Sequence, residues 1–400
     1  MDWNLSERLW QHVRDTTRKP LLSDVEISLL RNDLSFFLED QKCSSGISIA
    51  CGQPIALDLL QGCLELSADV DIAPPSQLAE GVRTGVLEPI PASGVWRPSA
   101  DPECPPQDLL LWDKPWQSGL ADPALLEDLV EEDVQAGFAD WIDGDEQTVR
   151  EKFGTVCAAG KLGIVQKEGS APRLIGDSSI SNVNSMCQIQ EKIELPGLDS
   201  LAAFVSRHAD QEWLGFSLDF NKAHKRIKVL PSEQGLSVFA VKLKDGSTRW
   251  VYYHTAHFGC SWASYWWARL AGAFIRTGHR LLSHAHFLCV YVDDVLALFP
   301  RHVAAPMSCL LICLACALGF PLSWHKLDLG HSLRWIGWQL EFGLGPRATL
   351  PADKLAAMLE ALEAIAAHPR RVPRKLLQQL VGRLVWFTSG ARWLRPWLQI

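Results

Sequence analysis

Two adjacent acids, Asp293 and Asp294, interrupt a run that is otherwise apolar from Phe287 to Phe299. The apolar residues on both sides predict a buried β-hairpin with the acids at its tip. At about 4 Å and an effective dielectric of about 20, two such charges repel by roughly 4 kcal/mol, so burying them without a counter-ion is costly. An Asp-Asp turn on the surface is common, but the apolar flanks argue against it. The run therefore predicts a hairpin that holds a cation.

A third acid, Asp219, ends a strand-like segment at residues 214–219, and basic residues follow it at Lys222, Lys225, Arg226 and Lys228. Taken alone, Asp219 is typical of a helix cap or a turn. Paired with Asp293 on a neighbouring strand, it would supply the carboxylate oxygens that Mg²⁺ prefers. Two Mg²⁺ ions held in this way can activate a primer 3′-hydroxyl and stabilise the leaving pyrophosphate, and phosphoryl transfer needs little beyond such positioning.

The charge is divided unevenly along the chain, although its net value is -8. Residues 1–150 contain 10 Lys/Arg and 28 Asp/Glu, whereas residues 151–400 contain 28 Lys/Arg and 18 Asp/Glu. This asymmetry fits a polyanion partner for the basic half, and it also fits two ordinary solvated surfaces. Nearly half of the residues are apolar, which is enough for a substantial core and excludes disorder over most of the chain.

The sequence favours an intracellular setting, either cytoplasmic or nuclear. The first 20 residues are charged and polar, unlike a secretory signal. The 11 cysteines show no paired spacing, which favours reduced thiols. Residues 303–320 are apolar and just long enough to span a bilayer, but a buried helix suits the flanking motifs better and no membrane partner is expected.

The chain divides into segments of different character. Residues 1–72 are acidic and carry no motif of known role, and ten of the 23 prolines fall between residues 74 and 123 and indicate an extended connector. Periodicity and turn residues then predict a helix from Leu125, a hairpin at 160–177, helices at 262–281 and 303–319, a second hairpin at 333–350 around Gly343–Pro346, and closing helices at 355–365 and 373–389.

Tyr291-Val292-Asp293-Asp294 resembles the Y-x-D-D signature of reverse transcriptases. A loose match to so short a motif is weak alone, but further motifs follow in the family's order over about residues 122–400. In this resemblance Asp219 and Asp293 are the catalytic, metal-binding acids, and Asp294 supports them. The segments Gly81–Ile90 and Ser178–Asn184 further resemble retrotransposon-type enzymes.

The resemblance also implies nucleotide-binding residues. Lys161 and Arg173 match the phosphate contacts of a fingers hairpin, and Phe220 would offer its backbone carbonyl to a metal. Phe258-Gly259 resembles the motif under the template and nucleotide, where a glycine permits close approach. His224 stands where the family usually has Tyr or Phe as a gate against the ribose 2′-hydroxyl, so it departs from the pattern.

Further motifs lie toward the C-terminus. Lys326, in Gly319–Lys326, matches a lysine that approaches the pyrophosphate, and Trp335-Ile336-Gly337 resembles the primer grip. A basic series that would suit contacts to a duplex backbone follows at Arg370, Arg371, Arg374, Lys375, Arg383, Arg392 and Arg395. On its own such a series is more often a solvated helix face.

The resemblance implies an α+β right-hand polymerase fold with fingers, an antiparallel-sheet palm and a partial helical thumb. The expected divisions are residues 1–72, a connector at 73–121, fingers at 122–205, palm at 206–345 and thumb-like helices at 346–400. The implied reaction adds dNTPs to a DNA or RNA primer on an RNA template, with two Mg²⁺ ions, or Mn²⁺ in their place. The oligomeric state is not predicted.

Three other functions stay open at this stage. His224 favours an RNA-dependent RNA polymerase, and a decayed element would leave a protein that only binds RNA. Residues 303–320 allow a membrane protein. Two metal-like groups are interpreted as structural: His254, His257 and Cys260 have no second ligand pair at zinc-finger spacing, and the cysteines at 309, 313 and 316 fall on one helical face.

Overall fold

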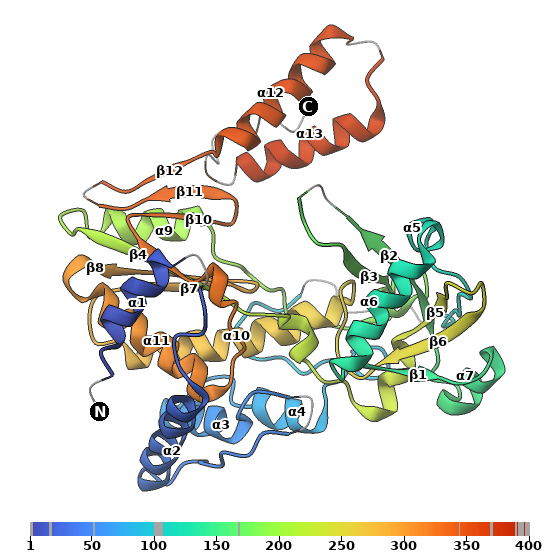
Figure 1. The fold of residues 1–400 in the computed structure, drawn as a ribbon, viewed down its shortest axis with the longest axis horizontal. Helices are drawn as coiled ribbons and strands as arrows, with labels where there is room; N and C mark the ends of the chain where they lie inside the picture. The colour runs from blue at the N-terminus through green and yellow to red at the C-terminus, as the bar shows by residue number, and fades with distance from the viewer. Residues whose placement is uncertain are drawn as a thin grey trace.

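A four-stranded antiparallel sheet carries the acidic hairpin within the described part of the chain (Figure 1). The computed structural model describes residues 3–15, 18–50, 53–99, 107–166, 169–343, 345–368, 371–388, 390 and 396. In spatial order, the strands of this sheet are β7 (Phe287–Tyr291), β8 (Asp294–Pro300), β4 (Trp213–Asp219) and β9 (Asp328–Gly330). The predicted hairpin and the strand that ends at Asp219 are both confirmed.

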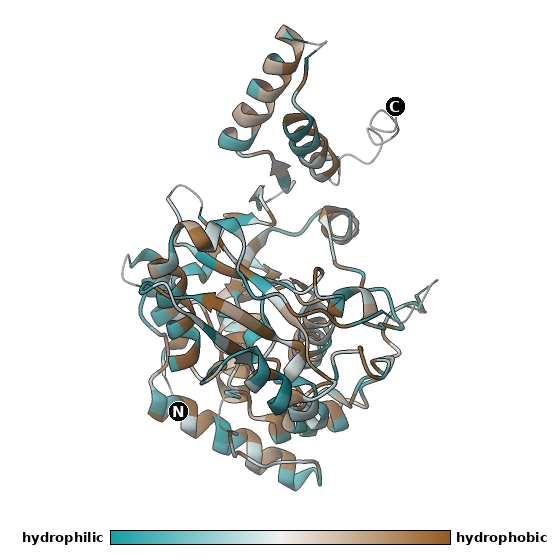
Figure 2. Ribbon diagram, turned by 90° about the vertical axis from the view of Figure 1, so that its right-hand side faces the viewer, coloured by the Kyte–Doolittle hydropathy of each residue, from teal (hydrophilic) through white to brown (hydrophobic). Residues whose placement is uncertain are grey.

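Strands β4 and β8 are apolar along their whole length because both faces of the sheet are covered. Along β8, Val295, Ala297 and Phe299 pack in the main core, whereas Leu296 and Leu298 face a second cluster on the other side. Such double burial produces continuous apolar runs instead of alternation. Figure 2 shows apolar residues gathered on strands and helices in the interior of the molecule.

The main core lies between this sheet and two long helices, α10 (Ser261–Leu281) and α11 (Ala304–Leu318). In the described residues, the stretch Arg301–Leu318 is the one helix long and apolar enough to cross a membrane, and 61% of it is buried inside the protein. It packs against α1, α2, β4 and β8. The prediction of a buried helix at 303–319 is therefore confirmed.

A mixed five-stranded sheet forms the part of the molecule to the right in Figure 1. Its strands and neighbouring helices are β1 (Ala139–Ile142), β6 (Thr248–Tyr253), β5 (Val238–Lys242), β2 (Ala159–Val165), β3 (Arg173–Asp177), α5 (Gln117–Ala121), α6 (Pro123–Gln135) and α7 (Glu146–Phe153). The predicted hairpin at 160–177 is confirmed as β2 and β3. Residues 238–253 join this sheet through β5 and β6, although the sequence placed them with the palm.

The N-terminal residues form helices that pack beneath α10 and α11. These helices are α1 (Leu5–Arg14), α2 (Asp24–Asp40), α3 (Leu57–Leu66) and α4 (Pro74–Glu80). Buried residues such as Leu9, Leu38 and Leu60 belong to the main core. The proline-rich segment is thus not wholly extended, because Pro74 and Pro75 occupy the first turn of α4, where a missing N–H is harmless.

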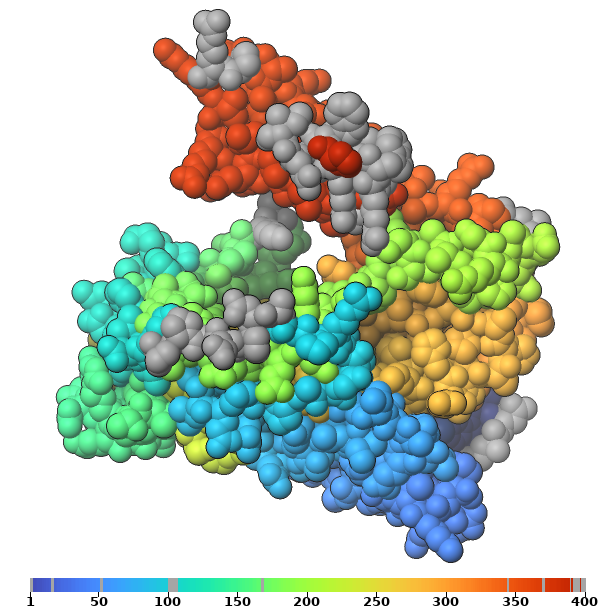
Figure 3. Space-filling view, turned by 180° about the vertical axis from the view of Figure 1, so that it is seen from behind, coloured from blue at the N-terminus to red at the C-terminus, as the bar shows by residue number. Residues whose placement is uncertain are grey.

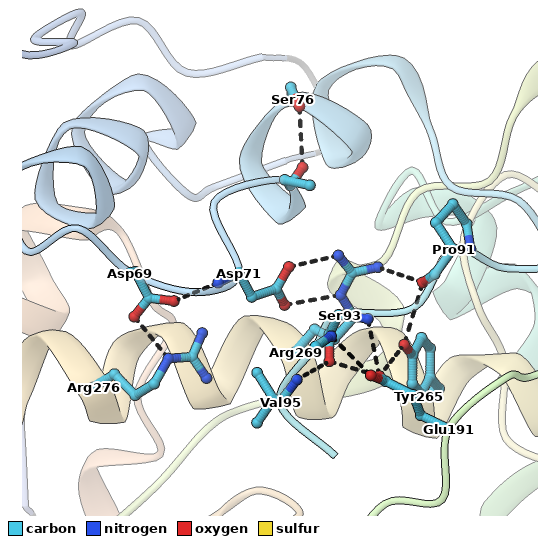
Figure 4. A network of polar contacts seen from close by, with 12 residues as sticks. Asp69, Asp71, Ser76, Pro91, Ser93, Val95, Glu191, Tyr265, Arg269 and Arg276 are labelled. Atoms are coloured by element: carbon cyan, nitrogen blue, oxygen red, sulfur yellow. Dashed lines mark hydrogen bonds and ion pairs between the residues drawn. The ribbon is translucent and has the colours of Figure 1, made fainter. Parts of the chain in front are cut away.

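Buried polar contacts fasten this N-terminal region to α10 (Figure 4). Arg269 binds Asp71 through two hydrogen bonds of 2.9 and 2.6 Å, with both side chains almost fully buried. Tyr265 donates a 2.7 Å hydrogen bond to Glu191, which also accepts from the backbone and hydroxyl of Ser93. A buried guanidinium needs such pairing, so these contacts fix the loops against the helix.

The C-terminal part is a three-stranded antiparallel sheet followed by a helix pair (Figure 1). Its elements are β10 (Ser332–Trp335), β11 (Trp338–Glu341), β12 (Arg347–Thr349), α12 (Ala352–Ala367) and α13 (Arg374–Phe387). The two closing helices are confirmed. The hairpin predicted around Gly343–Pro346 is found as β11 and β12, and a further, tighter turn at Ile336-Gly337 divides its first half into β10 and β11.

The helices α12 and α13 project beyond the C-terminal sheet (Figure 1), and Trp386 of α13 packs against Trp338 of β11. Figure 3 shows an open gap between the helix pair and the β2–β3 hairpin. The remaining short elements are α8 (Val183–Met186), α9 (Leu198–Ser206), η1 (Ala223–Arg226), η2 (Pro231–Leu236), η3 (Arg301–Val303) and η4 (Trp324–Lys326). The predicted α+β class, with an antiparallel sheet under the acids and helices at the C-terminal end, is confirmed.

Candidate active site

Three carboxylates converge at one end of the four-stranded sheet. Asp219 is the last residue of β4, and it lies opposite Asp294, the first residue of β8. The backbone N–H of Phe220 donates to the carbonyl oxygen of Asp293 at 3.0 Å, which joins β4 to the hairpin turn. One oxygen from each of the three acids lies within 4.8 Å of the others. The predicted meeting of acids from distant segments is confirmed.

Val292 shapes the turn that presents Asp293. Its φ of 57° lies in the left-handed region, which a β-branched side chain rarely adopts. The indole Nε1 of Trp267 donates a 2.6 Å hydrogen bond to the carbonyl oxygen of Val292. Backbone strain of this kind persists when surrounding contacts hold it, and it is common at functional sites. No local pattern in the sequence predicts this contact by Trp267.

Two carboxylates of the cluster, those of Asp293 and Asp294, have raised pKa values. Burial raises the pKa of Asp294 to about 6, helped by the charges of Asp293 and Asp219. Burial and the charge of Asp219 also raise the pKa of Asp293, while Lys326 and Arg173 oppose that rise. Among the described residues, this is the cluster whose carboxylates could hold a metal ion. A divalent cation would relieve the crowding of negative charge.

Lys326 neutralises part of this charge. Its Nζ lies 2.6 Å from Oδ2 of Asp219, and about half of the lysine side chain is exposed. The segment before it is attached to β4, because the N–H of Ser323 donates to the carbonyl oxygen of Asp219 at 2.9 Å. The predicted lysine motif therefore reaches the acids.

Phe220 anchors the strand end in the core. Its ring is 1% exposed and contacts Trp267, Phe274 and Phe320 at centroid distances of 5.5, 5.4 and 5.2 Å. These contacts fix the backbone on which Asp219 and the Phe220 carbonyl are carried.

His224, in η1, lies beside Phe258 with ring centroids 5.6 Å apart and nearly perpendicular. Burial lowers the pKa of His224, which favours the neutral ring. Its Nε2 has no hydrogen-bond partner among the described residues. Phe258 is 45% exposed. The pair therefore presents one buried polar atom and one open aromatic surface.

Gly259 allows the chain beside Phe258 to approach β3. With φ at 107°, a Cβ at this position would lie 1.8 Å from the carbonyl oxygen of Gly176. The N–H of Gly176 in turn donates to the carbonyl oxygen of Phe258 at 2.9 Å. The close approach seen here is to β3, and the approach to a base that the sequence predicts for Phe258-Gly259 stays a prediction.

The two predicted phosphate contacts are placed differently. Arg173 is near enough for its charge to oppose the rise in the pKa of Asp293, which burial chiefly causes. The Nζ of Lys161 lies over the rings of Trp112 and Trp116, 4.2 and 4.9 Å from their centroids. The structure brings Arg173 toward the acids, whereas Lys161 contacts two tryptophans that the sequence did not single out.

The predicted primer-grip residues form the turn between β10 and β11. Ile336 and Gly337 both have positive φ, 41° and 86°, as a two-residue hairpin turn requires. The indole Nε1 of Trp386 donates to the carbonyl oxygen of Ile336 at 3.2 Å, and Trp335 is buried. Asp294 and Ile336 line the same open cavity of about 790 Å³, so the turn lies near the acids.

The predicted basic series lies partly on α13 and just before it. Arg371, Arg374, Lys375 and Arg383 are exposed. Arg370, Arg392 and Arg395 lie outside the described residues. These four side chains are accessible to a nucleic-acid duplex, and their contact with one stays a prediction.

Among known proteins, similarity to this chain is found with solved structures. No family model matches the sequence, and no curated protein matches it. A foamy viral protease-reverse transcriptase in complex with double-stranded DNA is 12% identical with a TM-score of 0.49, and the match covers 77% of this chain and 47% of that one. The same enzyme in complex with an RNA/DNA hybrid is 13% identical with a TM-score of 0.47, covering 76% and 38%.

The native prototype foamy virus protease-reverse transcriptase is 14% identical with a TM-score of 0.41, covering 73% of this chain and 36% of that one. This chain thus spans about half or less of the length of these proteins. At this identity and these TM-scores, the likeness concerns the outline of the fold alone. The chemistry of this chain has to be argued from its own carboxylates.

Proposed function

We propose that this protein is an RNA-directed DNA polymerase, which adds dNTPs to a primer 3′-hydroxyl on an RNA template and releases pyrophosphate. The observation that carries the proposal is the convergence of Asp219, Asp293 and Asp294 within 4.8 Å at the end of an antiparallel sheet. Acids from segments over seventy positions apart meet there, in a setting that strongly disfavours three negative charges. Such a cluster is poorly explained by folding stability, since replacing charge with apolar residues would favour burial.

The donor set fits Mg²⁺, which takes one or two carboxylates together with phosphate oxygens. Asp219 and Asp293 are the proposed ligands, with the Phe220 carbonyl beside them and Asp294 in support. Bound there, two Mg²⁺ or Mn²⁺ ions would promote ionisation of the primer hydroxyl and neutralise the triphosphate.

The surrounding residues have positioning roles in this proposal. Arg173 holds the triphosphate, and Lys326 approaches the pyrophosphate. Phe258-Gly259 lies under the base, and Trp335-Ile336-Gly337 holds the primer end. Residues 122–205, 206–345 and 346–400 then act as fingers, palm and thumb around the primer–template, as in the retrotransposon-type enzymes that the sequence resembles.

An RNA-dependent RNA polymerase is the second candidate, and His224 favours it. Its buried Nε2 is free to hydrogen-bond, among the described residues, and a ribose hydroxyl is one group that could accept or donate there. Parallel incorporation of dNTPs and NTPs opposite the same RNA template separates the two candidates, because only the nucleotide sugar differs.

The decisive experiment is primer extension on an RNA template with Mg²⁺, comparing the wild type with Asp293→Asn. We expect the variant to lose extension, since the amide removes a charged metal ligand. Asp328→Asn is the matched control, because Asp328 lies in strand β9 of the same sheet outside the cluster and should retain activity. Undiminished extension by Asp293→Asn would refute the proposal.

A further inference from the structure

Two tryptophans are fixed along the outer edge of β2 with much of their surface open. The N–H of Trp112 donates to the carbonyl oxygen of Ala159 at 3.1 Å, and that of Trp116 to Leu162 at 2.8 Å. The indole Nε1 of Trp112 donates to the carbonyl oxygen of Ile180 at 2.9 Å. Trp112 is nevertheless 38% exposed and Trp116 40% exposed. Their backbones are held, while large aromatic surfaces face solvent.

A lysine lies between these indoles. The Nζ of Lys161 is 4.2 Å from the ring centroid of Trp112 and 4.9 Å from that of Trp116. Asp177, directly opposite on β3, accepts from the N–H of Ser179 instead. Within the described part of the chain, no carboxylate lies within ion-pair distance of Lys161. Its charge is therefore available to a phosphate.

The tryptophans lie on the face of the β2–β3 hairpin that also carries Arg173. Directly opposed residues share one face of a sheet, so Lys161, Gly163 and Val165 lie with Arg173 and Ile175. The alternate residues Leu162, Ile164 and Leu174 pack in the core on the other face.

Two features connect this face to the rest of the site. Gly163 leaves room for the edge of Trp116, whose Cδ1 would lie 3.5 Å from a Cβ there. Farther along the face is a cavity of about 300 Å³, lined by Val165, Ser170, Ala171, Arg173, Ile175 and Phe258.

From this arrangement we infer that Trp112, Trp116 and Lys161 bind the unpaired part of the RNA template strand that has yet to be copied. Bases stack on the open indole surfaces, and the lysine contacts the phosphate between them. Aromatic faces beside a cation are the usual means of holding single-stranded nucleic acid without sequence preference. The inference deepens the proposed function and rests on it for the identity of the strand.

The same contacts would also arise if the lysine merely covered two surface tryptophans. Trp141, on β1, and Arg249, on β6, provide the comparison. The Arg249 guanidinium lies 4.8 Å from the centroid of the Trp141 ring, and this pair lies away from Arg173. A nucleic-acid role predicts an effect at Trp112 and Trp116 that is absent at Trp141.

The test uses the full chain with Mg²⁺ and a fluorescent primer annealed to RNA, either blunt or with about six unpaired template nucleotides, a length near the site size of a small single-strand platform. Fluorescence anisotropy gives Kd for each substrate. We expect the wild type to prefer the overhang, and Trp112→Ala and Trp116→Ala each to reduce that preference about tenfold. Lys161→Met should also reduce the preference for the overhang, and the preference that remains should depend less on salt concentration. Trp141→Ala should match the wild type.

A wild type with no overhang preference, or alanine variants that keep it, would overturn the inference. If the alanine variants fail to fold, 5-iodouridine in the overhang of the wild-type complex replaces them: crosslinks to Trp112 or Trp116 support the inference, and crosslinks elsewhere alone refute it. Repeating the Kd measurement with a DNA overhang shows whether binding by Trp112, Trp116 and Lys161 requires RNA. If overhang binding depends on the tryptophans but no nucleotide is incorporated, the assignment of Trp112, Trp116 and Lys161 to RNA binding would stand. The proposed polymerase activity would then be rejected.

Discussion

Replacing Asp294 by Asn should stabilise the metal-free protein at pH 7.5. The wild type should gain stability as the pH falls, and the variant should gain less. Burial, with the charges of Asp293 and Asp219, raises the pKa of Asp294 from 3.8 to about 6. A carboxyl whose pKa is higher in the folded chain binds more protons folded than unfolded between those two pH values. Its ionisation therefore lowers the free energy of unfolding above pH 6, and that loss is recovered as the pH falls toward 4.

The size of the effect follows from the same geometry. A rise in pKa from 3.8 to about 6 corresponds to roughly 3 kcal/mol. Two charges 4.8 Å apart, the outer limit within the cluster, repel by about 3.5 kcal/mol at an effective dielectric of about 20. Because Asp294 is partly exposed and Lys326 offsets some negative charge, we expect a gain of about 1 to 2 kcal/mol for Asp294→Asn.

Urea unfolding in EDTA at pH 5.0 and 7.5 measures this gain. The midpoint of Asp294→Asn should exceed that of the wild type at pH 7.5, and this difference should be roughly half as large at pH 5.0, because the unfolded carboxyl is still mostly ionised there. Added Mg²⁺ should raise the wild-type midpoint more than the variant's, because the variant lacks one ligand charge. Asp328→Asn, outside the cluster, should follow the wild type. An Asp294→Asn protein that is less stable at pH 7.5 would refute the electrostatic reasoning.

Two other substitutions test the framework around the site. Asp71→Asn leaves Arg269 buried without its counter-ion and should cost about 3 to 5 kcal/mol in urea unfolding; a loss below about 1 kcal/mol would contradict the buried pairing. Gly259→Ala combines a positive φ with a Cβ 1.8 Å from the Gly176 oxygen, so it should be more destabilising than Gly246→Ala, where φ is 87° and nothing lies within 4 Å; equal melting temperatures would show that the approach to β3 is not constrained.

The parts of the site that the sequence predicted are those encoded by local patterns. The apolar run around Asp293 and Asp294 predicts its own hairpin, because strands buried on both faces cannot tolerate polar residues elsewhere. The end of β4 at Asp219 follows from the same logic. The resemblance then supplied the pairing of these acids, which spacing alone would have left open.

The parts that were missed depend on contacts between distant segments. The strands β5 and β6 flank a turn at Asp245-Gly246, and nothing local indicates that β5 pairs with β2. At the C-terminal sheet, Gly343–Pro346 gave the stronger turn signal, whereas the turn at Ile336-Gly337 places a branched residue at positive φ. The contact of Lys161 with Trp112 and Trp116 was also missed, because these residues are near one another only in the folded chain.

The N-terminal region lies outside the resemblance, yet its contacts lead to the turn that carries Asp293. Val292 keeps a left-handed backbone, which costs about 1 to 3 kcal/mol and requires support from its surroundings. That support includes the hydrogen bond from Trp267, a residue of α10, and two residues farther along the same helix Arg269 is bound to Asp71. A helix free to shift would release the Val292 carbonyl, and Asp293 would move with the turn. The N-terminal region therefore contributes to the site by holding α10 in place, and none of its described residues belongs to the carboxylate cluster.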